Sequence, residues 1–120
     1  MKKLLMAIVA LMLALSLAAC GGGKPPGMSQ TVYDRGQNVV KITEQYLNGD
    51  ITLDSALVLI NKETDVISNA RTNNSEDSLV SIYSSSILLT MQLSNLHEEI
   101  DYKTTIEDHL QDLKDCLAGR

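Results

Sequence analysis

Histidine and acidic side chains lie close together from His97 to Asp101 and could bind a metal ion. His97 and Asp101 are four residues apart, so a helix that continued through both would place them on one face. A zinc site needs three or four ligands, however, and helical spacing brings together only these two. The segment also lacks the second histidine of the H-E-x-x-H pattern. We therefore interpret it as an exposed polar end of a helix, and we expect no metal site and no cofactor.

His109 is the second candidate, because carboxylates lie beside it in the sequence. Asp108 and Asp112 are within three residues of it, and such neighbours can make a histidine responsive to pH. The alternative is a solvated helix face between Ile106 and Leu110. This is the interpretation that we prefer.

Cys116 is the third candidate, either as a nucleophile or as a thiol that pairs with another chain. Nucleophilic catalysis needs a base and an oxyanion stabiliser around the sulfur. His109 is seven residues away, about two helical turns, and nothing in the sequence resembles an oxyanion turn. We predict a small, partly buried side chain beside Leu113 and Leu117. A disulfide-linked dimer through Cys116 is the alternative in an oxidising compartment.

The rest of the sequence contains no catalytic pattern. There is no G-x-S-x-G motif and no glycine-rich phosphate loop before a helix, so we expect no catalytic residues and no enzymatic activity. The chain is acidic, with 15 Asp and Glu against 10 Lys and Arg and a net charge of −5. Because a negative surface repels phosphate backbones, nucleic acid is not an expected partner.

The N-terminal twenty residues have the three parts of an export signal. A positive start (Lys2 and Lys3) is followed by an uncharged apolar run over residues 4–17, and two alanines then precede Cys20. Even with these alanines the run has 16 residues, short of the ~20 that span a bilayer as a permanent helix. We therefore predict a cleaved signal peptide over residues 1–19. Its removal would leave 101 residues with a net charge of −7, because two lysines leave with it.

The stretch Leu17-Ala18-Ala19-Cys20 resembles the lipobox of bacterial lipoproteins in all four positions. The resemblance covers only the first twenty residues. It implies that a diacylglycerol is attached to the Cys20 sulfur and that the chain is then cleaved between Ala19 and Cys20. Two acyl chains, such as palmitate, would anchor the protein stably, since each buried CH₂ contributes about 0.8 kcal/mol. The expected location is the extracytoplasmic face of the cell membrane; an ordinary secretory signal or an uncleaved anchor is the alternative.

A short link separates Cys20 from the predicted domain. Residues 20–28 contain three consecutive glycines and a proline pair, a composition typical of linkers. Residues 21–27 would reach about 15 Å as a random coil. We therefore expect a domain over residues 29–120 that lies just off the membrane.

Apolar residues recur at helical spacing through the rest of the chain, and no stretch alternates as a strand does. The pattern predicts helices over about residues 29–48, 53–70, 76–99 and 105–117. Their core has to be aliphatic, because the chain contains four tyrosines but no tryptophan or phenylalanine. Amphipathic helices with short connections indicate an all-α fold, namely a small antiparallel helical bundle of three to four helices.

The third predicted helix is apolar on two sides. One face carries Leu79, Tyr83, Ile87 and Met91. The other face carries Ile82, Leu89, Leu93, Leu96 and Ile100. A helix with two apolar faces usually lies between neighbours, so we expect both faces to be buried.

Cap residues give more local predictions. Thr52 is the expected N-cap of the second helix, Asn74 or Ser75 that of the third, and a sequence like a capping box begins at Thr104 before the fourth. Gly36 lies inside the first helix, where glycine costs about 1 kcal/mol relative to alanine. A close helix crossing would explain its presence.

Together these features predict a membrane-anchored lipoprotein of the bacterial cell envelope. The interpretation that we prefer is a non-enzymatic protein-interaction module, which the lipid concentrates at the envelope and whose partner is an envelope protein. One alternative is a carrier that holds a small apolar ligand between its helices, and another is a prophage-type exclusion or immunity lipoprotein. The carrier would need a real cavity, whereas aliphatic cores of this length are normally filled.

Overall fold

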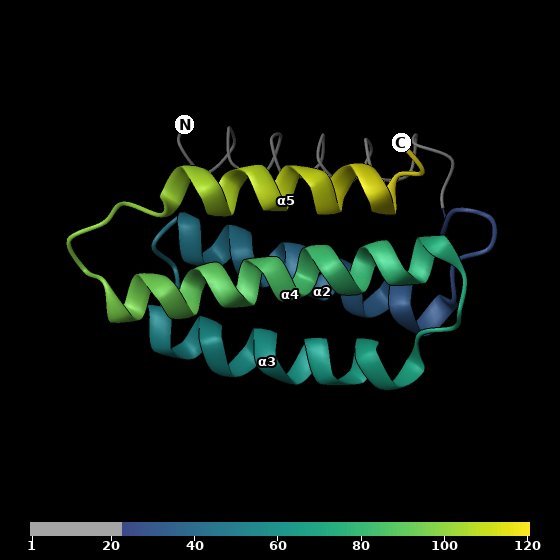
Figure 1. Cartoon of the computed structure of the whole chain (residues 1–120), viewed down its shortest axis with the longest axis horizontal. Coiled ribbons are helices and arrows are strands. Elements are labelled where there is room, and N and C mark those ends of the chain that lie inside the picture. The colour runs from purple at the N-terminus through teal and green to yellow at the C-terminus, as the bar shows by residue number, and fades with distance from the viewer. Residues whose placement is uncertain (1–22) are drawn as a thin grey trace, which may run out of the picture.

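Four helices make up the part of the chain that the computed structural model describes, residues 23–120 (Figure 1). In chain order they are α2 Gln30–Leu47, α3 Leu53–Ala70, α4 Ser75–Leu96 and α5 Lys103–Leu117. The predicted all-α fold is therefore confirmed. The predicted signal peptide and the lipobox residues, Cys20 among them, lie outside the described residues.

The four helices form a bundle in which consecutive helices are antiparallel and joined by short turns. Each helix packs against the one that follows it in the chain, and α2 also contacts α4 and α5. Figure 1 shows α4 in front of α2, with α5 above them and α3 below. None of these helices has both the length and the apolar character needed to cross a bilayer.

Aliphatic side chains from all four helices meet in one core. The buried members are Met28, Val32, Val39, Ile42, Ala56, Ile60, Ile67, Val80, Ile87, Met91, Ile106, Leu110, Leu113 and Leu117. The tyrosines lie at the edge of this core and are only partly buried. The core is thus aliphatic, as the composition requires.

Gly36 lies where α2 crosses α4 and α5 most closely. A Cβ atom at this position would lie 2.9 Å from a methyl group of Leu117 and 3.1 Å from a methyl group of Val80. Both separations are shorter than ordinary van der Waals contact. The predicted close crossing at Gly36 is confirmed, and it offsets the cost of a glycine inside a helix.

Two of the three predicted N-caps are present. The Thr52 hydroxyl accepts a hydrogen bond from the Ser55 N–H (3.2 Å), and Asn74, not Ser75, caps α4. The capping box at Thr104 was wrong, because α5 already begins at Lys103. The Asp101 carboxylate accepts a hydrogen bond from the Lys103 N–H (2.9 Å) and thereby satisfies an N–H that the first turn of a helix leaves free.

The prediction that both apolar faces of α4 are buried was wrong. Of the first predicted face, Ile87 and Met91 are buried and Tyr83 is partly buried, whereas Leu79 is 40 % exposed. The second face is exposed to solvent, with Ile82 at 54 % and Leu89 at 57 % of full exposure. The reason is that α2, α3 and α5 all pack on the same side of α4, and no described helix covers its other side.

The predicted link continues into the bundle. Met28, which we assigned to the linker, is 1 % exposed and belongs to the core. The Met28 N–H donates to the carbonyl of Pro25 (3.2 Å), which closes a turn immediately before α2. The packed domain therefore extends to Pro25, and fewer residues than expected remain to link it to Cys20.

Candidate functional site

His97 and Asp101 lie in the connection between α4 and α5, so no helix continues through both of them. α4 ends at Leu96, three residues earlier than predicted, and His97 is its C-cap residue in a non-helical conformation. The His97 imidazole lies 3.4 Å from the Glu99 carboxylate, and both side chains are exposed. Among residues 23–120, no three His, Cys, Asp or Glu side chains converge as metal ligands would.

His109 lies on α5 at the margin between the core and the solvent. Its neighbours Ile106 and Leu110 are buried, whereas Glu107 and Asp108 are exposed. The arrangement is that of a largely solvated helix face, the interpretation preferred from the sequence. No ion pair of the described residues involves this imidazole.

Cys116 is a free, partly buried thiol on the last turn of α5. Its sulfur lies 4.0 Å from the carbonyl oxygen of Glu76 on α4. Burial, and in second place the negative charge of Glu76, raises the pKa of the Cys116 thiol above its ordinary value. A nucleophilic cysteine requires the opposite environment, one that stabilises the thiolate.

Cys116 lines an open hollow of about 460 Å³ at one end of the bundle. The hollow is bordered by the first turn of α4, the last turns of α5 and the Pro25–Pro26 turn. Its charged lining consists of Glu76, Asp112, Asp115 and Arg120. The rest of the lining is mostly apolar, and the charged part is mainly acidic.

Asp77 lies in the first turn of α4, and the sequence analysis did not single it out. It is completely buried. One carboxylate oxygen accepts from the Ser29 N–H (2.8 Å), and the other accepts from the N–H (2.8 Å) and hydroxyl (3.0 Å) of Thr72. Asp77 therefore joins the start of α4 to the α3–α4 turn and to the start of α2.

Asn74 makes a second connection at the same place. Its side-chain oxygen accepts from the Asp77 N–H (2.7 Å), while its side-chain nitrogen donates to the carbonyl of Gly27. The Asn74-x-x-Asp77 spacing was the available signal, because it matches the N-cap and N3 positions of a helix. Nothing in the sequence indicates that Gly27 binds Asn74 or that Ser29 binds Asp77.

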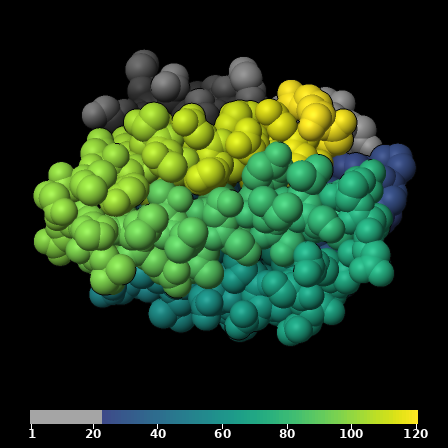
Figure 2. All heavy atoms as spheres, viewed as in Figure 1, coloured from purple at the N-terminus to yellow at the C-terminus, as the bar shows by residue number. Residues whose placement is uncertain are grey.

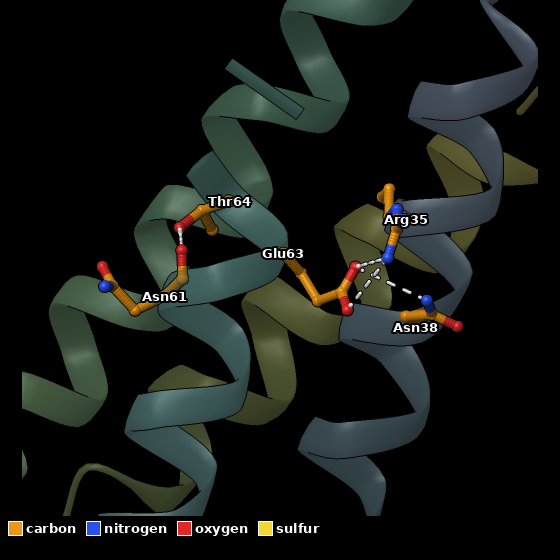
Figure 3. A network of polar contacts seen from close by, with 5 residues as sticks. All are labelled: Arg35, Asn38, Asn61, Glu63 and Thr64. Atoms are coloured by element: carbon orange, nitrogen blue, oxygen red, sulfur yellow. Dashed lines mark hydrogen bonds and ion pairs between the residues drawn. The ribbon is translucent and has the colours of Figure 1, made fainter. Parts of the chain in front are cut away.

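A second network that the sequence did not reveal connects α2 and α3 (Figure 3). Glu63 is buried on α3 and points toward Arg35 and Asn38 of α2, which donate to its carboxylate at 3.4–3.5 Å. These distances are long for hydrogen bonds. Because Arg35 is 39 % exposed and neutralises a carboxylate that is 11 % exposed, the network fixes the register of the two helices rather than forming a reactive site.

Comparison with known proteins finds no protein family, no curated protein and no solved structure that matches this chain. The assignment of function therefore depends on the N-terminal sequence and on the surface of the domain.

Proposed function

We propose that this chain is a lipid-anchored lipoprotein of the bacterial cell envelope and that it acts by contact with another protein, without catalysis. One observation carries the proposal. An uncharged apolar run that follows two lysines ends directly at Leu17-Ala18-Ala19-Cys20, a sequence that resembles the lipobox in every position.

The arrangement of the candidate side chains supports a non-catalytic role. His97 lies beside Glu99 at the end of a helix, and Asp101 binds the backbone of α5. The partly buried Cys116 has a raised pKa, which keeps its thiol protonated at neutral pH. The fully buried Asp77 carboxylate accepts hydrogen bonds from backbone N–H groups.

A carrier of apolar ligands fits the surface less well. The hollow beside Cys116 is open and has three carboxylates among its mostly apolar lining, and a second open hollow of about 440 Å³ is bordered by Glu98, Glu99, Asp101 and Lys103. Apolar ligands are held in enclosed pockets lined mainly by hydrophobic side chains. Neither hollow is enclosed, and each has several charged side chains in its lining.

The two cysteines allow a controlled test of the anchor. Cells that express Cys20→Ala are grown with an alkyne-labelled palmitate, and Cys116→Ala is the matched control. We expect Cys20→Ala to lose the label, because its sulfur carries the lipid, whereas Cys116→Ala keeps it. Label that persists in Cys20→Ala would contradict the proposal, as would mass spectrometry that finds an unmodified residue 20 in the purified protein.

The interaction role is tested separately from the anchor. Crosslinking in intact cells, followed by purification of the lipidated protein from membranes, should yield a defined envelope protein. The same protocol with Cys20→Ala should yield less of it, because the lipid raises the local concentration of the domain. Recovery of bound lipid in place of a protein would support the carrier alternative.

A further inference from the structure

The exposed face of α4 is the largest feature of the surface that the proposed function does not use. Its members follow one another at helical spacing and are Leu79, Ile82, Leu89, Leu93 and Leu96. Every one of them is between 37 % and 74 % exposed. Figure 2 shows α4 uncovered across this side of the molecule. We call these five side chains the outer face of α4.

The outer face of α4 is also uncharged. No Asp, Glu, Lys or Arg occurs between Asp77 and His97, although the chain as a whole is acidic. The uncharged part of α4, residues 78–96, has 19 residues and is about 28 Å long. Exposed apolar surfaces of this size are often functional, as contacts with another molecule or with a membrane.

We infer that the outer face of α4 rests on the bilayer to which the lipid on Cys20 anchors the chain. The inference depends on the proposed function, because it needs the lipid to bring the domain to the membrane. Three observations favour the bilayer over other occupants: the length of the link, the position at which it leaves the bundle, and the distribution of charge.

The link is short and leaves the bundle beside the start of α4. Only four residues separate Cys20 from Pro25, so their Cα atoms are at most about 17 Å apart. Pro25 packs near Gly119 and borders the same hollow as Glu76. A helix is about 10–12 Å across, so a lipid on Cys20 holds the first turn of α4 within about two helix diameters of the bilayer.

The distribution of charged side chains indicates which side of the bundle faces the membrane. The end of the bundle where the link leaves carries Glu76, Asp112 and Asp115, and anionic lipids repel carboxylates. Leu79, the first residue of the outer face of α4, borders this hollow, whereas the rest of the face carries no charge to be desolvated. An orientation with Ile82, Leu89, Leu93 and Leu96 against the bilayer buries these side chains and keeps the carboxylates at its margin, where they can stay hydrated.

A second copy of the chain fits the outer face of α4 less well than a bilayer does. A face about 28 Å long and 10 Å wide presents roughly 280 Å², so two copies would bury roughly 560 Å². Stable protein interfaces bury about 1,200–2,000 Å². A bilayer has no such minimum, because each side chain that enters the boundary between headgroups and acyl chains contributes separately.

A single tryptophan can report on this contact, because the chain contains none. The test uses the full-length protein, processed and lipidated in cells, purified, and reconstituted into vesicles of phosphatidylcholine and phosphatidylglycerol in equal parts. Leu89→Trp places the reporter on the outer face of α4. Val58→Trp is the matched control, since Val58 is an exposed aliphatic residue of α3.

We expect brominated acyl chains to quench Leu89→Trp about fivefold more strongly than Val58→Trp, because side chains of an interfacial helix reach the acyl boundary. Iodide, which quenches from the water, should quench Val58→Trp more strongly than Leu89→Trp. Adding Leu93→Asp to Leu89→Trp should remove the excess quenching while the helical circular dichroism stays unchanged.

Two results would overturn the inference. Equal iodide quenching at both positions would show that the outer face of α4 remains in water. Protection from iodide without quenching by brominated lipid would show that a protein, such as a second copy, covers it. Either result leaves the proposed anchor intact, because mass spectrometry of residue 20 in the same preparation tests the lipid independently.

Discussion

Asp77 is a fully buried carboxylate that is held by uncharged donors. It accepts hydrogen bonds from the Ser29 N–H and from the N–H and hydroxyl of Thr72, and it lies in the first turn of α4, where the helix dipole favours negative charge. Hydrogen bonds to a charged acceptor are stronger than those between neutral groups. These interactions offset the cost of burying the carboxylate and fix the junction of three segments.

We expect Asp77→Ala to lower the free energy of unfolding by about 3 kcal/mol, because two backbone N–H groups lose their acceptor in a buried position. Urea denaturation followed by circular dichroism measures the loss. Asp54→Ala is the matched control, since Asp54 lies in the first turn of α3 but is exposed; it should cost at most about 1 kcal/mol. Equal losses in the two variants would show that the hydrogen bonds of Asp77 contribute nothing beyond the dipole.

The Cys116 thiol gives a prediction about pH. Its pKa is raised by burial and by the charge of Glu76, so iodoacetamide should alkylate it more slowly than free cysteine at pH 8. Glu76→Gln should increase the alkylation rate at this pH, because the second cause of the raised pKa is removed. An unchanged rate in Glu76→Gln would mean that burial alone protects the thiol.

The raised pKa of Cys116 also affects the stability of the fold at alkaline pH. The pKa of this thiol is higher in the folded chain than in the unfolded chain. Its contribution to stability is therefore complete at pH values below the pKa of the unfolded chain. This contribution is lost as the pH rises above the ordinary thiol value of 9.0 and through the folded pKa. The alkaline loss of stability should therefore be smaller in Cys116→Ser than in the wild type.

Among the helices, α4 has apolar residues on nearly every side, but other helices pack against only one of its sides. Ile87 is completely buried, whereas Leu89, two residues later, is 57 % exposed. Hydrophobicity alone does not distinguish these two residues. Their environments differ because α2, α3 and α5 occupy one side of α4.

We expect Ile87→Ala to lower the free energy of unfolding in solution by about 2–5 kcal/mol, because it leaves a cavity in the core. Leu89→Ala should change the same quantity by less than about 0.5 kcal/mol, since its side chain is largely in water. Thermal or urea denaturation of the two variants measures the difference. A large loss in Leu89→Ala without a membrane would indicate that another protein chain covers this face.

At the scale of the molecule, the boundary between link and domain determines how closely the bundle follows its anchor. Met28 is in the core, and Gly27 is bound by Asn74. The segment before α2 is therefore part of the folded unit. Its packing shortens the free link to Cys20 and restricts the orientations that the bundle can adopt above a membrane.

Truncation tests where the folded unit begins. A chain that starts at Ser29 should unfold about 2–5 kcal/mol more easily than one that starts at Gly23, because it lacks the buried Met28 side chain. A chain that starts at Pro25 is the control and should match the longer one. If all three chains were equally stable, Met28 would contribute nothing to the core.

The helical fold and much of its local detail can be predicted from patterns along the chain. Helical periodicity predicted four helices, Thr52 and Asn74 were recognised as caps, and Gly36 indicated a close crossing that the structure contains. These features depend on neighbours along the chain or on one side of a single helix, so the pattern of residue types is sufficient to predict them.

The packing of the helices determines which apolar face of α4 is buried and which polar groups meet, and sequence patterns did not predict either. Ile82 and Leu89 stay exposed because of where the other helices pack, and Asp77 meets Ser29 although 48 residues separate them. His97 and Asp101 do not share a helix because α4 ends at Leu96. Such outcomes depend on how whole helices pack against one another, and the spacing of residues within one helix carries no information about them.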